Sequence, residues 1–94
     1  MKILIKGKVW LYPGLAGWHF VYAGKEDSER LRRPDGKRVR KGFIPIRATL
    51  GDTTWDTSLF PHKGEPYLLS IKASVRKAEG IFVGDTVTVH CTLR

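Results

Sequence analysis

The sequence contains little cysteine and little acid. Cys91 is the single cysteine among 94 residues, which excludes a disulfide framework and a cysteine-rich metal site. A reducing compartment fits this composition best. Asp and Glu number 9 against 17 Lys and Arg, so the formal net charge is +8. A field of this sign attracts polyanions and acidic surfaces, although it does not specify a fold.

Long apolar runs are also missing. No segment approaches the ~20 apolar residues that a membrane-spanning helix needs. Lys6 and Lys8 interrupt the apolar N-terminal stretch before it reaches the length of a signal-peptide core. We therefore expect a cytoplasmic protein with no membrane association. A chain of 94 residues is expected to form a single domain, 1–94.

Alternating apolar residues predict a series of short strands. The expected strands cover residues 3–11, 17–24, 43–50, 53–60, 67–71 and 86–93. The pair around Gly51-Asp52 gives the clearest hairpin signal. In the last strand, alternation places Val87, Val89 and Cys91 on the inner face, with the threonines and His90 outside.

Two short helices interrupt these strands. Residues 25–42 form a charged connection in which Ser28 can cap a helical turn carrying Leu31. Residues 72–80 predict a second short helix that Gly80 ends. Closing the sheet on itself removes exposed strand edges. The sequence therefore predicts a mostly-β fold, a small closed β-barrel of about six strands with two short helices.

The C-terminal region resembles a known DNA-binding module. Ile71, Lys72, Val75 and Arg76, followed by GIFVGDTVTV at 80–89, are similar to the end of AbrB/MazE-type swapped-hairpin modules. This resemblance covers about a fifth of the chain and implies a strand, helix, turn and strand. It adds a DNA-binding expectation only by analogy, because a shared fold does not imply a shared function.

A second resemblance covers most of the chain. GWHFVYAG at 17–24, TTWDTSLFP at 53–61 and YLLSIKASVRKAEGIFVGDTVTV at 67–89 are similar to a small bacterial family of double-split β-barrels of unknown function. That barrel is sometimes joined to a bacteriocin-protection related segment, which this sequence does not show. The resemblance implies the fold, and it brings no activity, cofactor or catalytic residue. Ser70 departs from the proline that these families commonly carry before the short helix.

The sequence offers little catalytic chemistry. His19, His62 and His90 are scattered, with no signature that joins them to a nucleophile and no metal-ligand spacing. Asp56 is an acid inside a strand pattern, and it would serve as a general base if burial raised its pKa. We expect instead that it faces solvent or pairs with a base. The chain therefore favours a non-enzymatic binding module without a cofactor.

A basic segment is the stronger functional signal. Seven bases face one acid, Asp35, between residues 30 and 41; they are Arg30, Arg32, Arg33, Lys37, Arg38, Arg40 and Lys41. Lys72 and Arg76 lie on one face of the second helix and can support this segment. The pattern predicts binding of an anionic partner, foremost nucleic acid, without sequence-specific readout. The alternative interpretation is a solvated loop on a basic protein.

Aromatic residues give the competing hypothesis. A pocket around Trp55, Ser58 and Phe60, with His62 and Lys63 from the next loop, can bind a small ligand or a protein. Trp55, Trp18 and Tyr22 are possible stacking platforms for a base, but in a domain this small we expect them in the core. The sequence leaves a monomer and a homodimer equally open.

Overall fold

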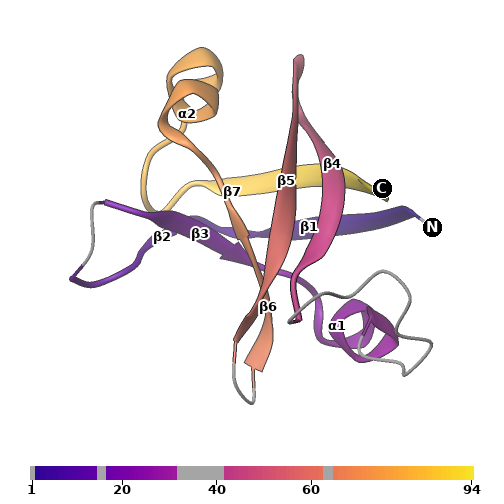
Figure 1. Cartoon of the computed structure of the whole chain (residues 1–94). Coiled ribbons are helices and arrows are strands. Elements are labelled where there is room, and N and C mark those ends of the chain that lie inside the picture. Colours follow the sequence, from indigo (N-terminus) through magenta and orange to yellow (C-terminus); the bar gives the residue numbers. More distant parts are fainter. Residues whose placement is uncertain (1, 15–16, 32–41, 63–64) are drawn as a thin grey trace.

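The described residues form one seven-stranded antiparallel sheet that curls into a nearly closed barrel (Figure 1). This computed structural model describes residues 2–14, 17–31, 42–62 and 65–94. The strands are β1 (Lys2–Lys8), β2 (Trp10–Leu11), β3 (His19–Tyr22), β4 (Ile44–Leu50), β5 (Thr53–His62), β6 (Glu65–Ser70) and β7 (Thr86–Leu93). The helices are α1 (Lys25–Leu31) and α2 (Ala73–Glu79). The strand order is β1-β7-β4-β5-β6-β3-β2, which confirms the predicted mostly-β barrel.

The N-terminal segment of the chain supplies both end strands of the sheet, β1 and β2. It was expected to run unbroken through 3–11, but the ladder is interrupted at Val9. Before this point β1 pairs with β7, and after it β2 pairs with β3. The Val9 N–H donates to the carbonyl of Asp85 (2.9 Å), and the Val9 carbonyl accepts from the Gly84 N–H (2.8 Å). One bent segment thus joins the two ends of the sheet.

Aliphatic side chains fill the barrel. Ile5, Ile44, Ile46 and Leu59 are fully buried, and the inner row of β7 is buried as its alternation predicts. Burial also raises the pKa of the Cys91 thiol to about 12. Because the thiolate is the reactive form of cysteine, Cys91 acts as a core residue rather than a nucleophile.

The two helices lie at opposite ends of the barrel (Figure 1). Leu31 of α1 and Val75 of α2 are buried in the core, so each helix closes one end of the barrel. Gly80 ends α2 in the left-handed conformation, with φ of 65°. Neither described helix has the length and hydrophobicity to span a bilayer.

Two local predictions were wrong. Helix α1 begins before Ser28, so Ser28 is not its cap; its buried hydroxyl instead accepts a hydrogen bond from the Tyr67 N–H (3.0 Å). The loop expected after Phe60 is shorter, because β5 continues to His62 and β6 begins at Glu65. The Ser28 contact joins segments 39 residues apart, which local patterns do not contain. The strands β5 and β6 extend because His62 pairs with Glu65 across the hairpin.

The β4–β5 turn packs against the end of α2. Gly51 has a φ of +60°, and a Cβ placed there would overlap the carboxylate of Glu79. The same carboxylate accepts a hydrogen bond from Thr53 Oγ1 (2.6 Å). Gly80 has a similar φ of +65°, but a Cβ placed there would have no neighbour within 4 Å.

We therefore expect Gly51→Ala to lower the free energy of unfolding more than Gly80→Ala does. Both variants force alanine into the left-handed region, at a cost of about 1–2 kcal/mol. Only Gly51→Ala must also displace Glu79 and break its bond to Thr53, adding about 1 kcal/mol. Urea unfolding measures the difference. When Glu79→Ala is also present, Gly51→Ala and Gly80→Ala should lower the free energy of unfolding by similar amounts. Similar losses in the protein that retains Glu79 would contradict this packing.

Candidate functional site

Aromatic rings gather on the outside of the barrel rather than in its core. Phe20 is the centre of this cluster and is only 5% exposed. Its ring lies 5.6–5.9 Å, centroid to centroid, from the rings of Trp10, Tyr12, Trp18 and Phe60. Beyond these contacts, Phe43 packs on Phe60 and Tyr22 packs on Trp10. The outer face of β2, β3 and β5 is thus a continuous aromatic surface.

The placement of Trp18 and Tyr22 differs from the expectation. Both were expected in the core, yet Trp18 is 43% exposed and Tyr22 is 37% exposed. Alternation along β3 puts both rings on the same outer face as Phe20, while Val21 fills the interior. Trp55 is buried as expected.

The pocket expected around Trp55 is therefore divided between two faces of β5. Trp55 belongs to the barrel core, whereas Ser58 and Phe60 occupy alternate positions that face outward. Lys63 lies outside the described residues.

An apolar groove does lie on the outer face, on different residues from those expected. It has a volume of about 340 Å³ and is lined by Tyr12, Trp18, Phe20, Phe60, Pro61, His62 and Leu68. Of the predicted pocket residues, Phe60 and His62 line it. His62 Nδ1 is buried without a hydrogen-bond partner among the described residues. Leaving a buried polar group unpaired costs about 1–3 kcal/mol.

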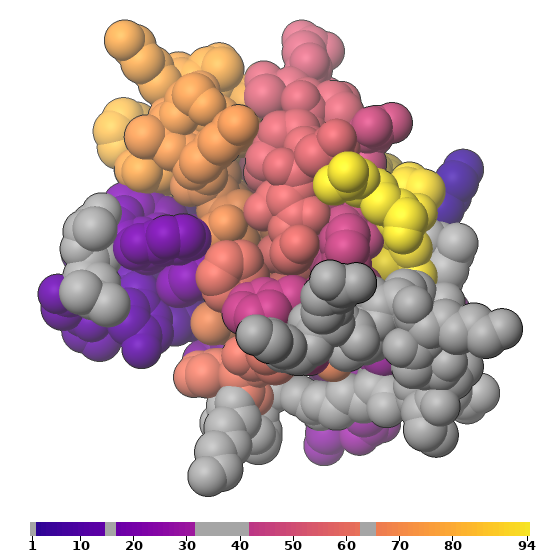
Figure 2. All heavy atoms as spheres, in the orientation of Figure 1, coloured from indigo at the N-terminus to yellow at the C-terminus, as the bar shows by residue number. Residues whose placement is uncertain are grey.

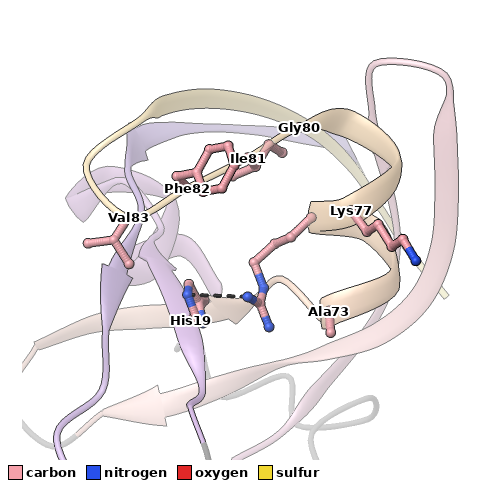
Figure 3. A pocket seen from close by; sticks show the side chains of 8 residues that line it. His19, Ala73, Lys77, Gly80, Ile81, Phe82 and Val83 are labelled. Carbon is pink, nitrogen blue, oxygen red and sulfur yellow. Dashed lines mark hydrogen bonds between the residues drawn. The ribbon is translucent and has the colours of Figure 1, made fainter.

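A second depression lies beneath α2, where β3 begins (Figure 3). This cleft has a volume of about 630 Å³, and its lining is His19, Ala73, Arg76, Lys77, Gly80, Ile81, Phe82 and Val83. Figure 3 shows His19 on one side of the cleft and Phe82 on the other. Phe82 and Val83 are 71% and 52% exposed, so one wall is an open apolar surface.

Arg76 is held in this cleft by two hydrogen bonds. Its Nε–H donates to the carbonyl of Ile71 (3.0 Å), and its Nη1–H donates to His19 Nε2 (3.3 Å). The Nδ1–H of His19 donates to the carbonyl of Gly17 (2.6 Å), which leaves the Nε2 lone pair free to accept. A guanidinium has five N–H donors, so three remain for an anion.

A smaller depression joins the groove to the cleft. Its volume is about 220 Å³, and its lining is Gly17, Trp18, His19, Ser70, Ile71, Lys72, Ala73 and Arg76. Trp18 also lines the groove, while His19 and Arg76 also line the cleft. Figure 2 shows α2 and the β2–β3 hairpin side by side on this part of the surface. We call the groove, the small depression and the cleft together the binding track.

The binding track is cationic. Lys72, Arg76 and Lys77 line it, and no Asp or Glu is among the residues that line its three parts. Lys72 is exposed and its side chain makes no capping hydrogen bond to α2. An anionic partner would therefore meet attraction and no opposing carboxylate along the walls of the track.

The predicted basic residues are only partly brought together. Lys72 and Arg76 share the track, as expected for two residues on one helical face. Arg30 is paired with Asp27 (3.1 Å) on α1, which lies at the other end of the barrel (Figure 1). The remaining bases lie outside the described residues; they are Arg32, Arg33, Lys37, Arg38, Arg40 and Lys41. Their role in anion binding stays a prediction.

Asp56 is engaged in an ion pair on the outer surface. Both of its oxygens accept hydrogen bonds from Arg47, at 2.8 and 3.2 Å. The hydrogen bond from Arg47 holds the pKa of Asp56 below its ordinary value of 3.8. The expectation that Asp56 pairs with a base is confirmed, and its pKa is shifted in the opposite direction to the one that a general base would need. The described residues also contain no cluster of His, Cys, Asp or Glu suited to a metal ion.

Replacement of Arg47 should raise the pKa of Asp56. In the native protein the Asp56 carboxyl should titrate below 3.8, and in Arg47→Ala it should return toward that value. The Arg47–Asp56 pair therefore stabilises the folded state at pH values above the ordinary pKa of Asp56. This stabilisation is lost as the pH falls through the lowered pKa that Asp56 has in the folded state. NMR titration of the carboxyl carbon measures both midpoints. A native midpoint above 3.8 would contradict the assigned pair.

Comparison with known proteins assigns the fold to a family. Residues 6–91 match the family model described as Domain of unknown function (DUF1905). Because this match covers most of the chain, the protein belongs to that family. No curated protein matches the chain. The predicted membership of a family of unknown function is therefore confirmed. The likeness to AbrB/MazE-type modules stays a prediction.

Proposed function

We propose that this domain is a non-enzymatic binding module for single-stranded nucleic acid. The observation that carries the proposal is the binding track, which combines exposed rings with three cations and has no carboxylate in its lining. Proteins that bind single strands combine a positive groove for the backbone with aromatic side chains on which bases stack. The track has both parts in one continuous surface.

Trp18 links these two parts. Its ring packs on Phe20 and Phe60, with centroids 5.8 and 5.9 Å away, and is still 43% exposed. It lines both the aromatic groove and the depression that contains Lys72 and Arg76. A base stacked on Trp18 would therefore place its phosphate close to the two cations.

A single strand suits this surface better than a duplex does. In a duplex the bases stack on one another, so their faces are not available to protein rings. Reading a duplex takes an element that enters a groove and contacts base edges. The binding track is a set of depressions, and it offers rings and cations in place of a protruding helix or ribbon.

The first described residues after the basic segment lie at the rim of the aromatic groove. The basic segment of residues 30–41 is followed directly by Gly42 and Phe43. Gly42 lies against Pro61, and the Phe43 ring packs on Phe60 at 5.3 Å. The attachment of the basic segment to these two residues in the sequence supports a contribution of that segment to phosphate binding.

A small apolar ligand or a protein partner is the second candidate function. The observation in its favour is that the aromatic groove contains no Lys or Arg in its own lining. A ligand confined to this groove would depend on Trp18 and Phe60 but would not respond to changes at Lys72. The two candidates thus differ in their charge dependence.

Fluorescence anisotropy with labelled oligonucleotides tests the proposal. A single strand of mixed sequence should bind more tightly than a duplex of the same length. Trp18→Ala should weaken binding roughly 5- to 150-fold, since one base–aromatic stack contributes about 1–3 kcal/mol. Lys72→Gln should reduce the slope of log K against log salt by about 0.7, the value for one phosphate contact on a single strand.

Lys6→Gln is the matched control for Lys72→Gln. Lys6 is an exposed lysine on β1, outside the lining of the track, and its loss changes the net charge equally. If Lys6→Gln and Lys72→Gln weaken binding to the same extent, attraction is generic and the proposal fails. The second candidate would be favoured by a non-nucleotide ligand whose binding is weakened by Trp18→Ala and unchanged by Lys72→Gln.

A further inference from the structure

The size and lining of the aromatic groove fit one flat ring system. Its volume of about 340 Å³ is at the lower end of the ~300–1,000 Å³ typical of ligand pockets. The floor is formed by Phe20, which is nearly buried, and the more exposed Trp18 stands beside it. Trp18 and Phe60 already touch each other, so a ring would lie on this pair rather than between its members.

His62 is held in a fixed orientation at this groove. Its ring stacks on Tyr22 at 5.9 Å with an interplanar angle of 21°. Tyr22 in turn stacks on Trp10 at 5.2 Å and 23°. This three-ring stack runs from β2 to the end of β5 and restrains rotation of the imidazole.

The buried nitrogen of His62 determines which atom carries the ring proton. Nδ1 is buried and has no partner among the described residues. A buried N–H without an acceptor is rarer in proteins than an unpaired acceptor, so the proton of the neutral ring is better placed on Nε2. His62 then provides the groove with one N–H donor among otherwise largely apolar walls.

We propose that the aromatic groove binds one purine base of the single strand, with its N7 atom accepting a hydrogen bond from His62 Nε2. This inference rests on the proposed function. Adenine and guanine both carry an N7 acceptor, and neither pyrimidine does. A purine also covers more of the Trp18 and Phe60 rings than a pyrimidine covers. The two effects act together, so the groove gives purine preference without distinguishing adenine from guanine.

A 7-deazapurine separates the hydrogen bond from stacking. This base keeps the shape and the stacking face of a purine but has a carbon in place of N7. We compare oligothymidine strands that carry one central adenine, one 7-deazaadenine or thymine only, by anisotropy against the native protein. The adenine strand should bind most tightly, and 7-deazaadenine should lose roughly three- to tenfold, as expected for one hydrogen bond.

His62→Phe provides the second arm of the experiment. Phenylalanine preserves a ring that can stack on Tyr22 but has no N–H. In this variant adenine and 7-deazaadenine should bind equally, at the level of 7-deazaadenine on the native protein. His90→Phe is the matched control, since His90 lies on the exposed face of β7 between β1 and β4. It should leave the three- to tenfold difference intact.

The outcomes distinguish this inference from the function on which it rests. If the strands bind through Trp18 and Lys72 but 7-deazaadenine binds as tightly as adenine, the His62 hydrogen bond is wrong and the single-strand function stands. If none of the strands binds more tightly than the duplex, both proposals fall. The comparison of adenine with 7-deazaadenine on the native protein needs no variant, so a folding defect in His62→Phe cannot obscure it.

Discussion

Two hydrogen bonds attach Val9, the residue between the two end strands β1 and β2, to the turn at Gly84 and Asp85 that precedes β7. They interrupt the first strand, so that its first part completes the β7 side of the barrel and its second part pairs with β3. The bend also needs a close approach, since a Cβ on Gly7 would lie 3.3 Å from Val21 Cγ1. The β2–β3 hairpin is thereby fixed beneath α2. Every part of the binding track depends on that placement, because Trp18 and His19 belong to the hairpin and Arg76 belongs to the helix.

The narrow barrel explains why the rings are outside. Ile, Val, Leu and Ala side chains fill most of its interior, and Trp55 is the largest ring among the core residues. The remaining large rings of β2 and β3 occupy the other face of their strands, where they pack on one another and bury Phe20. An aromatic surface that remains partly exposed after such packing is a feature of interaction sites. The same constraint that forms the core thus produces the surface that we assign to binding.

Sequence patterns predicted much of the fold. Alternation gave the inner row of β7 and the hairpin at Gly51, and Gly80 marked the end of α2. In β3, however, alternation separates Trp18, Phe20 and Tyr22 from His19, Val21 and Ala23 without saying which set faces inward. We expected the aromatic set inside because its side chains are large and hydrophobic. The structure has the set with Val21 and Ala23 inside, because the limited space of the barrel favours smaller side chains. The interruption at Val9 also escaped prediction, because it depends on a turn about 75 residues away along the chain.

The site was less accessible to prediction than the fold. Lys72 and Arg76 were recognised from their helical spacing, whereas the role of His19 required knowledge of its partner on α2. Alternation places His19 on the same face of β3 as Val21, and His19 is the first residue of that strand, where the cleft lies. A polar residue at the start of an inward-facing row is the sequence signal that could have identified His19. Phe60 and His62 line one groove, whereas Trp55, which was grouped with them because it is close in sequence, lies on the other face of the strand. The surface that we propose for binding forms only when the hairpin, β5 and α2 are placed together.

An NMR titration of the isotope-labelled protein with a short single-stranded oligonucleotide tests the binding track most directly. We expect the largest chemical-shift changes at the Trp18 indole and at the backbone amides of His19 and Arg76. The buried Trp55 indole provides an internal reference that should move little. Changes centred instead on the lysines of β1, with Trp18 unaffected, would show that the strand follows the net charge and not the track, and would contradict the account.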